Sequence, residues 1–249
     1  MNPALQGTVL VSDRVLDQYA TDGVSVIRRF FEPAFVESLD RGWQTLKRQI
    51  AEGTQARNAR FVPGSLPEPL DSVYRHPNLV KTVQRILGTE DVALYMNRVL
   101  LKDREWNGAV AIHQDMPYFS GGLNKVSVFV PLTPTAARNG NGGLIFLKGS
   151  HKYGNLQRGT IRREVFPPMD ELAPDLDVGD IVLMDILTWH YSEDAVIADD
   201  RPLMQIVYQP SSDGSYGGPT IGVPKPTLVS GRWLNEHFAA WGESTTPDA

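Results

Sequence analysis

Two histidines and one aspartate stand out in this chain because their side chains could hold a metal ion. His113 and Asp115 are separated by one residue, and His190 follows 77 residues after His113. Two imidazoles and one carboxylate are the ligands by which mononuclear non-haem Fe(II) oxygenases hold one face of their iron. Arg201, eleven residues after His190, could bind the far carboxylate of a 2-oxo acid through two parallel charged hydrogen bonds. The pattern indicates oxygen chemistry at iron, and it does not indicate a substrate.

Each of these residues also has an ordinary explanation. A His-x-Asp pair arises by chance in many proteins and is usually a surface or capping pair. His190 follows Trp189, and a lone histidine in an apolar context is more often a core residue. Arg201 follows two aspartates and could be a surface arginine at the end of a turn. The metal interpretation therefore depends on the order and the flanks of these residues.

The segments that carry the candidate ligands have the character of strands. His113 directly follows the apolar run 110–112. In a continuous strand residues i and i+2 lie on the same face, so His113 and Asp115 would both point into one barrel interior. His190 comes after a strand that begins near Gly179. We expect two strands from facing sheets to bring the three ligands together.

The rest of the chain predicts helices first and short strands afterwards. Apolar residues at helical spacing predict helices at 13–22, from Pro33 to about residue 50, at 79–87 after His76-Pro77-Asn78, and from Trp233 to Trp241, with a strand at 24–27. Glycine-rich turns separate β-type runs, which suit an antiparallel sandwich or jelly roll. These runs are 92–102, 110–113, 126–132, 144–147, 181–184 and 203–208.

We expect a single domain over residues 1–249 with an all-β core and flanking helices (α+β). Its parts would be an N-terminal helical part at about 13–90, a core at about 91–212 and an extension at 213–249. A hydrophobic fraction of 41% and a charged fraction of 21% are ordinary for a globular domain.

Composition excludes several classes of function. A net charge of −5 provides no basic field for nucleic acid or anionic membrane. The absence of cysteine excludes disulfides, thiolate metal sites and cysteine nucleophiles. The sequence shows no signal-peptide pattern and no apolar run of membrane-spanning length. We expect a soluble cytoplasmic protein, a monomer or homodimer, whose partner is a small molecule.

Three ordered motifs resemble one known family. They are His113-Gln114-Asp115-Met116-Pro117-Tyr118-Phe119, the segment 141–152 (NGGLIFLKGSHK), and the block from Gly179-Asp180 through His190 and Ser192 to Arg201. Together with Tyr19-x-x-Asp22-Gly23 they resemble the phytanoyl-CoA dioxygenase family of Fe(II)/2-oxoglutarate oxygenases. The resemblance covers most of residues 15–210 in the correct order.

The resemblance implies a double-stranded β-helix and a role for each motif residue. His113, Asp115 and His190 would bind Fe(II) and form the catalytic centre, while Arg201 and Ser192 would hold the distal carboxylate of 2-oxoglutarate. The strand 94–102 often supplies a further polar contact in this family, for which Asn97, Arg98 and Lys102 are candidates.

The family's reaction couples oxidative decarboxylation of 2-oxoglutarate with O₂, giving succinate and CO₂, to hydroxylation or a related oxidation of a small molecule. Such a substrate could belong to specialised metabolism. Related halogenases lack the carboxylate ligand, so Asp115 argues against halogenation.

Substrate contacts are expected from the loops around the mouth of the barrel. These loops are 56–64, 118–122, 153–165 and 216–218. Tyr118 is a candidate contact, Gln114 could face either the substrate or the scaffold, and Trp189 could shape the pocket or belong to the core. A basic stretch suggests an anionic substrate or carrier, or alternatively a solvated surface; it comprises Lys148, Lys152, Arg158, Arg162 and Arg163.

Two other functions stay open at this point. One is a cupin-type metal enzyme that does not use 2-oxoglutarate, and the other is a catalytically silent jelly-roll binding protein.

Overall fold

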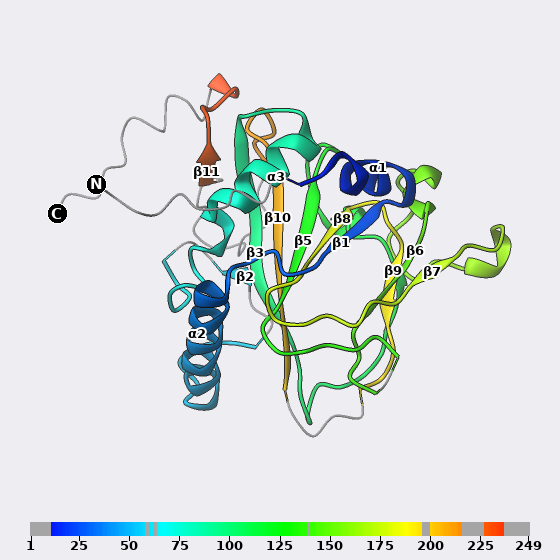
Figure 1. The fold of residues 1–249 in the computed structure, drawn as a ribbon. Helices are drawn as coiled ribbons and strands as arrows, with labels where there is room; N and C mark the ends of the chain where they lie inside the picture. Colours follow the sequence, from blue (N-terminus) through cyan, green and yellow to red (C-terminus); the bar gives the residue numbers. More distant parts are fainter. Residues whose placement is uncertain are drawn as a thin grey trace.

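Two antiparallel sheets form the centre of the molecule (Figure 1). The computed structural model describes residues 11–57, 60–61, 64–138, 140–195, 200–215 and 227–236, with only the backbone at 60–61. The larger sheet has the order β1 (Val24–Ile27), β8 (Ile181–Asp185), β5 (Val126–Pro131), β10 (Arg201–Pro210), β3 (Val92–Lys102) and β11 (Thr227–Ser230), and β2 (Arg60–Phe61) also pairs with β3. The smaller sheet has the order β4 (Val110–His113), β9 (His190–Ser192), β6 (Leu144–Leu147) and β7 (Glu171–Leu172).

The alternation of side chains along the larger sheet gives it two buried faces. Val126, Val128 and Val130 of β5 belong to the apolar cluster on the side of the helices. Phe129, one residue out of phase, packs instead against Phe146 of the smaller sheet. Because successive side chains of a strand point to opposite faces, one strand can serve both the helix-side core and the space between the sheets.

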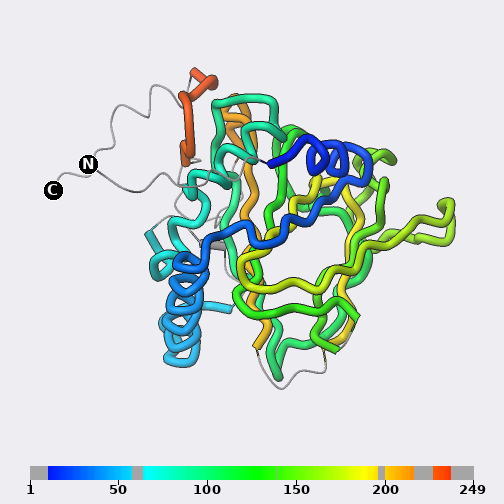
Figure 2. Tube along the Cα trace, viewed as in Figure 1, coloured from blue at the N-terminus to red at the C-terminus, as the bar shows by residue number. Residues whose placement is uncertain are grey.

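Three α-helices flank this core. Helix α1 (Asp13–Asp22) ends at Gly23, whose φ of 75° is a left-handed conformation that glycine adopts without strain. Figure 2 shows α1 beside β1, which continues the chain after this turn. Helices α2 (Pro33–Ala51) and α3 (Pro77–Leu87) each begin with proline, and their buried apolar side chains join the helix-side cluster. The described residues also contain four short 3₁₀ turns: η1 (Val73–Arg75), η2 (Met116–Tyr118), η3 (Ser150–Tyr153) and η4 (Arg163–Val165).

The fold confirms the expected class, a jelly-roll core with flanking helices. The strands expected at 92–102, 110–113 and 144–147 have those bounds, and β10 extends further at both ends than the run 203–208. The chain is not helical at Trp233, and residues 237–241 of the expected last helix lie outside the described residues. None of the helices in the described ranges is long and apolar enough to span a membrane. A single domain over residues 1–249 stays a prediction.

Candidate metal and 2-oxo acid site

His113, Asp115 and His190 meet at one point between the two sheets. The Nε2 atom of His113 lies 3.9 Å from Asp115 Oδ1, and that of His190 lies 3.8 Å from the same oxygen. One ligand atom from each of the three residues lies within 4.8 Å of those from the other two. Metal bonds to such nitrogen and oxygen atoms are about 2.0–2.2 Å long, so the three side chains can hold one ion.

The route by which the fold assembles these residues differs from the expected one. His113 and His190 are direct partners in the antiparallel pair β4–β9, so they come from adjacent strands of one sheet. The expectation of two strands from facing sheets was therefore wrong. Asp115 lies beyond the end of β4, immediately before η2, and its φ of −73° and ψ of −39° are helical rather than extended. The turn, and not strand periodicity, directs Asp115 toward the histidines.

Backbone carbonyls orient both imidazole rings. Nδ1 of His113 lies 2.8 Å from the carbonyl oxygen of Ala111, and Nδ1 of His190 lies 3.0 Å from that of Thr188. In a neutral ring this Nδ1–H donates to the carbonyl, which leaves the Nε2 lone pair for a metal. Burial, and then the charge of His113, lower the pKa of His190 to about 4, so that this ring is neutral at pH 7.

The larger sheet holds the aspartate from the other side. Gln205 of β10 donates its amide to Asp115 Oδ2 at 2.8 Å, and Ser127 of β5 donates its hydroxyl to the same oxygen at 3.2 Å. Arg98 of β3 donates Nε–H to Gln205 Oε1 at 2.7 Å, which fixes the orientation of the amide. Oδ2 is thus occupied by protein donors, whereas Oδ1 faces the two Nε2 atoms.

Gln205 and Ser127 were not among the residues predicted from the sequence. Both are polar residues within strands whose neighbours are apolar, and both are almost fully buried. A buried polar side chain in an apolar strand needs a partner, and this signal could have pointed to them.

Arg201, Ser192 and Lys102 form a polar end of the same region. Arg201 is 3% exposed and donates one Nη2–H to the Gly142 carbonyl at 2.8 Å, while its Nε and Nη1 atoms are buried and have no hydrogen-bond partner among the described residues. The hydroxyl of Ser192 is likewise buried without a partner. Burial lowers the pKa of Arg201 to about 10, which leaves the guanidinium charged at neutral pH. Unused donors around a buried cation fit a carboxylate ligand.

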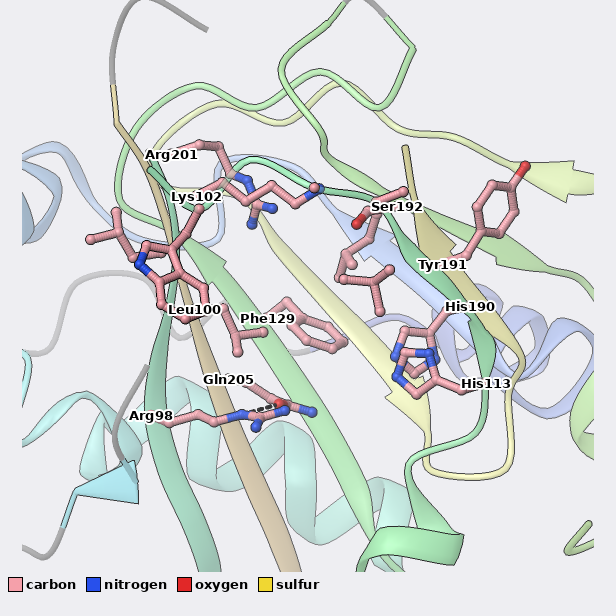
Figure 3. Close-up of a pocket in the computed structure, with 16 residues that line it drawn as sticks. Arg98, Leu100, Lys102, His113, Phe129, His190, Tyr191, Ser192, Arg201 and Gln205 are labelled. Atoms are coloured by element: carbon pink, nitrogen blue, oxygen red, sulfur yellow. Dashed lines mark hydrogen bonds between the residues drawn. The ribbon is translucent and has the colours of Figure 1, made fainter. Parts of the chain in front are cut away.

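A cavity of about 390 Å³ connects this polar end to the histidines. Figure 3 shows Arg201, Lys102 and Ser192 at one end, His113 and His190 at the other, and Phe129 between them. The volume lies in the range of small-molecule sites, about 300–1,000 Å³. The cavity can therefore hold a small dicarboxylic acid with one end at the arginine and the other beside the metal ligands.

A second cavity of about 370 Å³ reaches the metal ligands from another side. Asp115 and Tyr118 line it, and it shares Arg98, Val110 and His113 with the first cavity. The ring of Tyr118 packs edge-on against His113 with a centroid separation of 6.2 Å. Tyr118 thus lies beside the metal ligands, and its contact with a substrate stays a prediction.

The other candidate residues lie elsewhere. Asn97 and Arg98 are successive residues of β3 and therefore lie on opposite faces of the sheet. Asn97 shares its face with Val99, which packs in the helix-side cluster, and it lines neither cavity. Trp189 is fully buried against Tyr153 and Phe166 and lines neither cavity, so of the two possibilities left open for it these contacts support the core.

Gln114 does not face the substrate side either, because its amide is used by the backbone. Nε2 donates to the carbonyls of Gly154 and Leu187, each at 2.7 Å, and Oε1 accepts from Leu156 N–H at 2.9 Å. Of the two possibilities left open for Gln114, the scaffold role is the one that these contacts support. Of the basic stretch, Arg163 pairs with Glu171, and Arg158 lies over the ring of Tyr118.

Comparison with known proteins supports this description. Residues 19–202, well over half of the chain, match the model of the family described as Phytanoyl-CoA dioxygenase (PhyH). No curated protein sequence matches the chain significantly.

Several solved structures share the fold at low sequence identity. The epimerase SnoN in complex with Fe³⁺, alpha ketoglutarate and nogalamycin RO is 17% identical, with a TM-score of 0.70 over 88% of this chain and 95% of that one. EctD from S. alaskensis with 2-oxoglutarate and 5-hydroxyectoine is 19% identical, with a TM-score of 0.72 over 94% and 89%. The apo non-heme monooxygenase ThoJ is 22% identical, with a TM-score of 0.69 over 87% and 84%.

Proposed function

The chain belongs to the phytanoyl-CoA dioxygenase (PhyH) family, and from this we propose that it hydroxylates a C–H bond of a small molecule. Fe(II), 2-oxoglutarate and O₂ are the cofactor and co-substrates of the family. The proposal assigns the metal to His113, Asp115 and His190, and the distal carboxylate of 2-oxoglutarate to Arg201.

The observation that carries the proposal is one cavity with two matching ends. At one end Arg201 and Ser192 have buried polar atoms without partners, and at the other three ligand atoms converge. A cupin-type enzyme that does not use a 2-oxo acid has no need of a buried arginine with unused donors. A silent binding protein has no need of a complete set of ligands.

Each residue of the site contributes through binding and orientation. When bound, Fe(II) with 2-oxoglutarate and O₂ supplies the oxidising chemistry. Arg201 and Ser192 would hold the keto acid by its distal carboxylate, with Lys102 adding positive charge at the same end. Gln205 and Ser127 keep Asp115 Oδ1 directed at the histidines. Phe129 and Leu100 exclude water from the cavity between its two ends.

The structures of relatives agree with a small-molecule substrate. SnoN was solved with nogalamycin RO and EctD with 5-hydroxyectoine, and both structures also contain a 2-oxo acid. These molecules are ligands of those proteins; for this chain they support a small organic substrate that binds together with a 2-oxo acid.

An anaerobic titration tests the proposal. Fe(II) and 2-oxoglutarate added to the intact chain should produce the visible charge-transfer band of a chelated keto acid. The His113→Ala variant should lose the band, and Arg201→Ala should need a higher concentration of 2-oxoglutarate for the same band. An intact protein that binds Fe(II) but shows no band would support the cupin-type alternative. A protein that binds neither would support a silent jelly roll.

A further inference from the structure

The second cavity is the side from which a substrate can reach the metal ligands. The first cavity contains Arg201, Lys102 and Ser192, which the proposed function assigns to 2-oxoglutarate. Asp115 lines only the second cavity, and His113 lines both. With the co-substrate in the first cavity, the second is left for the molecule that is oxidised.

Positive charge dominates the surroundings of the second cavity. Arg98 lines it, and of the described residues that line it the only acidic one is Asp115, whose charge the metal would neutralise. The guanidinium of Arg158 lies 4.6 Å from the centroid of the Tyr118 ring, and Tyr118 lines the cavity. Within the described part of the chain no carboxylate forms an ion pair with Arg158.

The loop that carries Arg158 is tied on one side to Ile112 of β4 and on the other to Gln114, the residue after β4. Before Arg158, the N–H of Leu156 donates to Gln114 Oε1 at 2.9 Å. After it, the N–H of Ile161 donates to the Ile112 carbonyl at 2.9 Å. Such anchoring holds Arg158 at a fixed place relative to the metal ligands, although its side chain is exposed. It also gives Gln114 a positioning role through this loop.

We propose that the primary substrate carries an anionic group, a carboxylate or a phosphate ester, which Arg158 binds at the mouth of the second cavity. The proposal rests on the proposed function and adds its substrate class. Tyr118 holds the guanidinium by a cation–π contact, so that its N–H donors are available to a planar or tetrahedral oxyanion. The apolar body of the substrate would then lie against Phe119 and Val110, toward His113 and Asp115.

Binding of simple probes tests the proposal without knowledge of the natural substrate. The full chain is loaded with Mn(II) and saturating 2-oxoglutarate, so that Arg201 is occupied, and is titrated calorimetrically with benzoate, phenyl phosphate or benzamide. We expect at least one of the two anions to bind about tenfold or more tightly than benzamide, because the neutral probe lacks the charge-assisted hydrogen bonds. The tighter of the two anions identifies carboxylate or phosphate.

Two arginines of the same segment provide matched variants. Arg158→Ala should weaken binding of the preferred anion by about tenfold, the loss typical of one charged hydrogen bond. Arg162→Ala removes the same charge from an exposed residue that lines neither cavity, and it should leave binding unchanged. Equal binding of benzamide and the anions, no binding of either anion, or equal effects of the two variants would each overturn the proposal. Failure of 2-oxoglutarate itself to bind would instead refute the proposed function.

Discussion

The geometry of Asp115 depends on two polar residues of the opposite sheet. Gln205 and Ser127 both donate to Oδ2, and Oδ1 alone faces the histidines. Partners of this kind orient a metal ligand, and their loss typically costs about 10–100-fold in metal affinity. The amide of Gln205 in turn accepts a hydrogen bond from Arg98. Residues of three strands, β3, β5 and β10, therefore orient the carboxylate of Asp115.

We therefore expect Gln205→Leu to weaken metal binding by about 10–100-fold. The measurement is a competitive Mn(II) or Fe(II) titration of the apo protein. Gln209→Leu is the matched control, because Gln209 lies on the same strand and is equally buried, while its side chain bonds, within the described residues, to Asp213 and Ser215 and not to Asp115. Equal metal affinities in the two variants would show that Gln205 has no special role at the metal.

Lys102 provides a prediction about pH. Burial first, and then the positive charge of Arg201, lower its pKa to about 8, against an opposing effect of Asp194. Bound 2-oxoglutarate is a dianion and would raise the pKa of Lys102 again. Above pH 8 the complex would therefore hold more protons than the free protein. The affinity for 2-oxoglutarate should consequently fall as pH rises from about 8 to about 9.5, since Lys102 is then neutral in the free protein.

The dependence is measured as the dissociation constant of 2-oxoglutarate in the metal-loaded protein across this range. Lys102→Met should bind 2-oxoglutarate more weakly and without the pH dependence, while Lys102→Arg should bind it tightly at every pH. Arg201, with a pKa of about 10, stays largely charged over most of the range. A pH dependence that persists in Lys102→Met would assign it to another group.

The sequence predicted the residues of the site better than their surroundings. The ligands and Arg201 could be found because their types and spacing are chemically restrictive. Trp189 and Gln114, by contrast, were considered only as neighbours of the ligands. Both lie just outside the strands β4 and β9, and their side chains are used by packing in the case of Trp189 and by backbone hydrogen bonds in the case of Gln114.

At the level of elements, the pairing of β4 with β9 is what the sequence could not specify. β9 has only three residues, too few for a periodic pattern, and its register with β4 brings together residues far apart in the chain. Helices α1 and α3 were predictable to their ends, because Gly23 and Gly88 stop them in the left-handed conformation. Local signals thus fix helix ends, whereas long-range pairing is set by burial over the whole fold.

The turn before β6 offers a prediction about the polar end of the first cavity. Gly142 has a φ of 71°, and its carbonyl accepts a hydrogen bond from Arg201. A Cβ atom added there would lie 2.9 Å from Lys102 Nζ and 2.9 Å from Ala195 Cβ. Gly142→Ala should weaken 2-oxoglutarate binding by about tenfold and leave metal affinity unchanged, because both cations of that end would shift.

Gly53→Ala controls for backbone strain alone. Gly53 has a similar φ of 72°, and a Cβ there would meet no atom within 4 Å. Both variants should lose about 1 kcal/mol of stability in urea denaturation, the usual cost of a side chain in this conformation. Only Gly142→Ala should change the affinity for 2-oxoglutarate; an equal effect of both would attribute the change to general destabilisation.

At the level of the whole molecule, the site joins the two sheets. His113 and His190 belong to the smaller sheet, whereas Arg201 and Gln205 belong to the larger one. The many short runs between glycine-rich turns were enough to predict a jelly roll, yet not which runs share a sheet. A metal and a 2-oxo acid that contact both sheets would bind only the folded chain, so they should stabilise it.

We therefore expect two separable increases in melting temperature. Each ligand at about 100 times its dissociation constant adds about 2.7 kcal/mol, and for a chain of this size that corresponds to about 5–10 °C. Mn(II) alone should give the first increase and 2-oxoglutarate added to the Mn(II) form the second. Arg201→Ala should keep the first and lose most of the second, while His190→Ala should lose both, each compared with its own unliganded form. A second increase that survives in Arg201→Ala would place the distal carboxylate elsewhere and would contradict the assignment of Arg201.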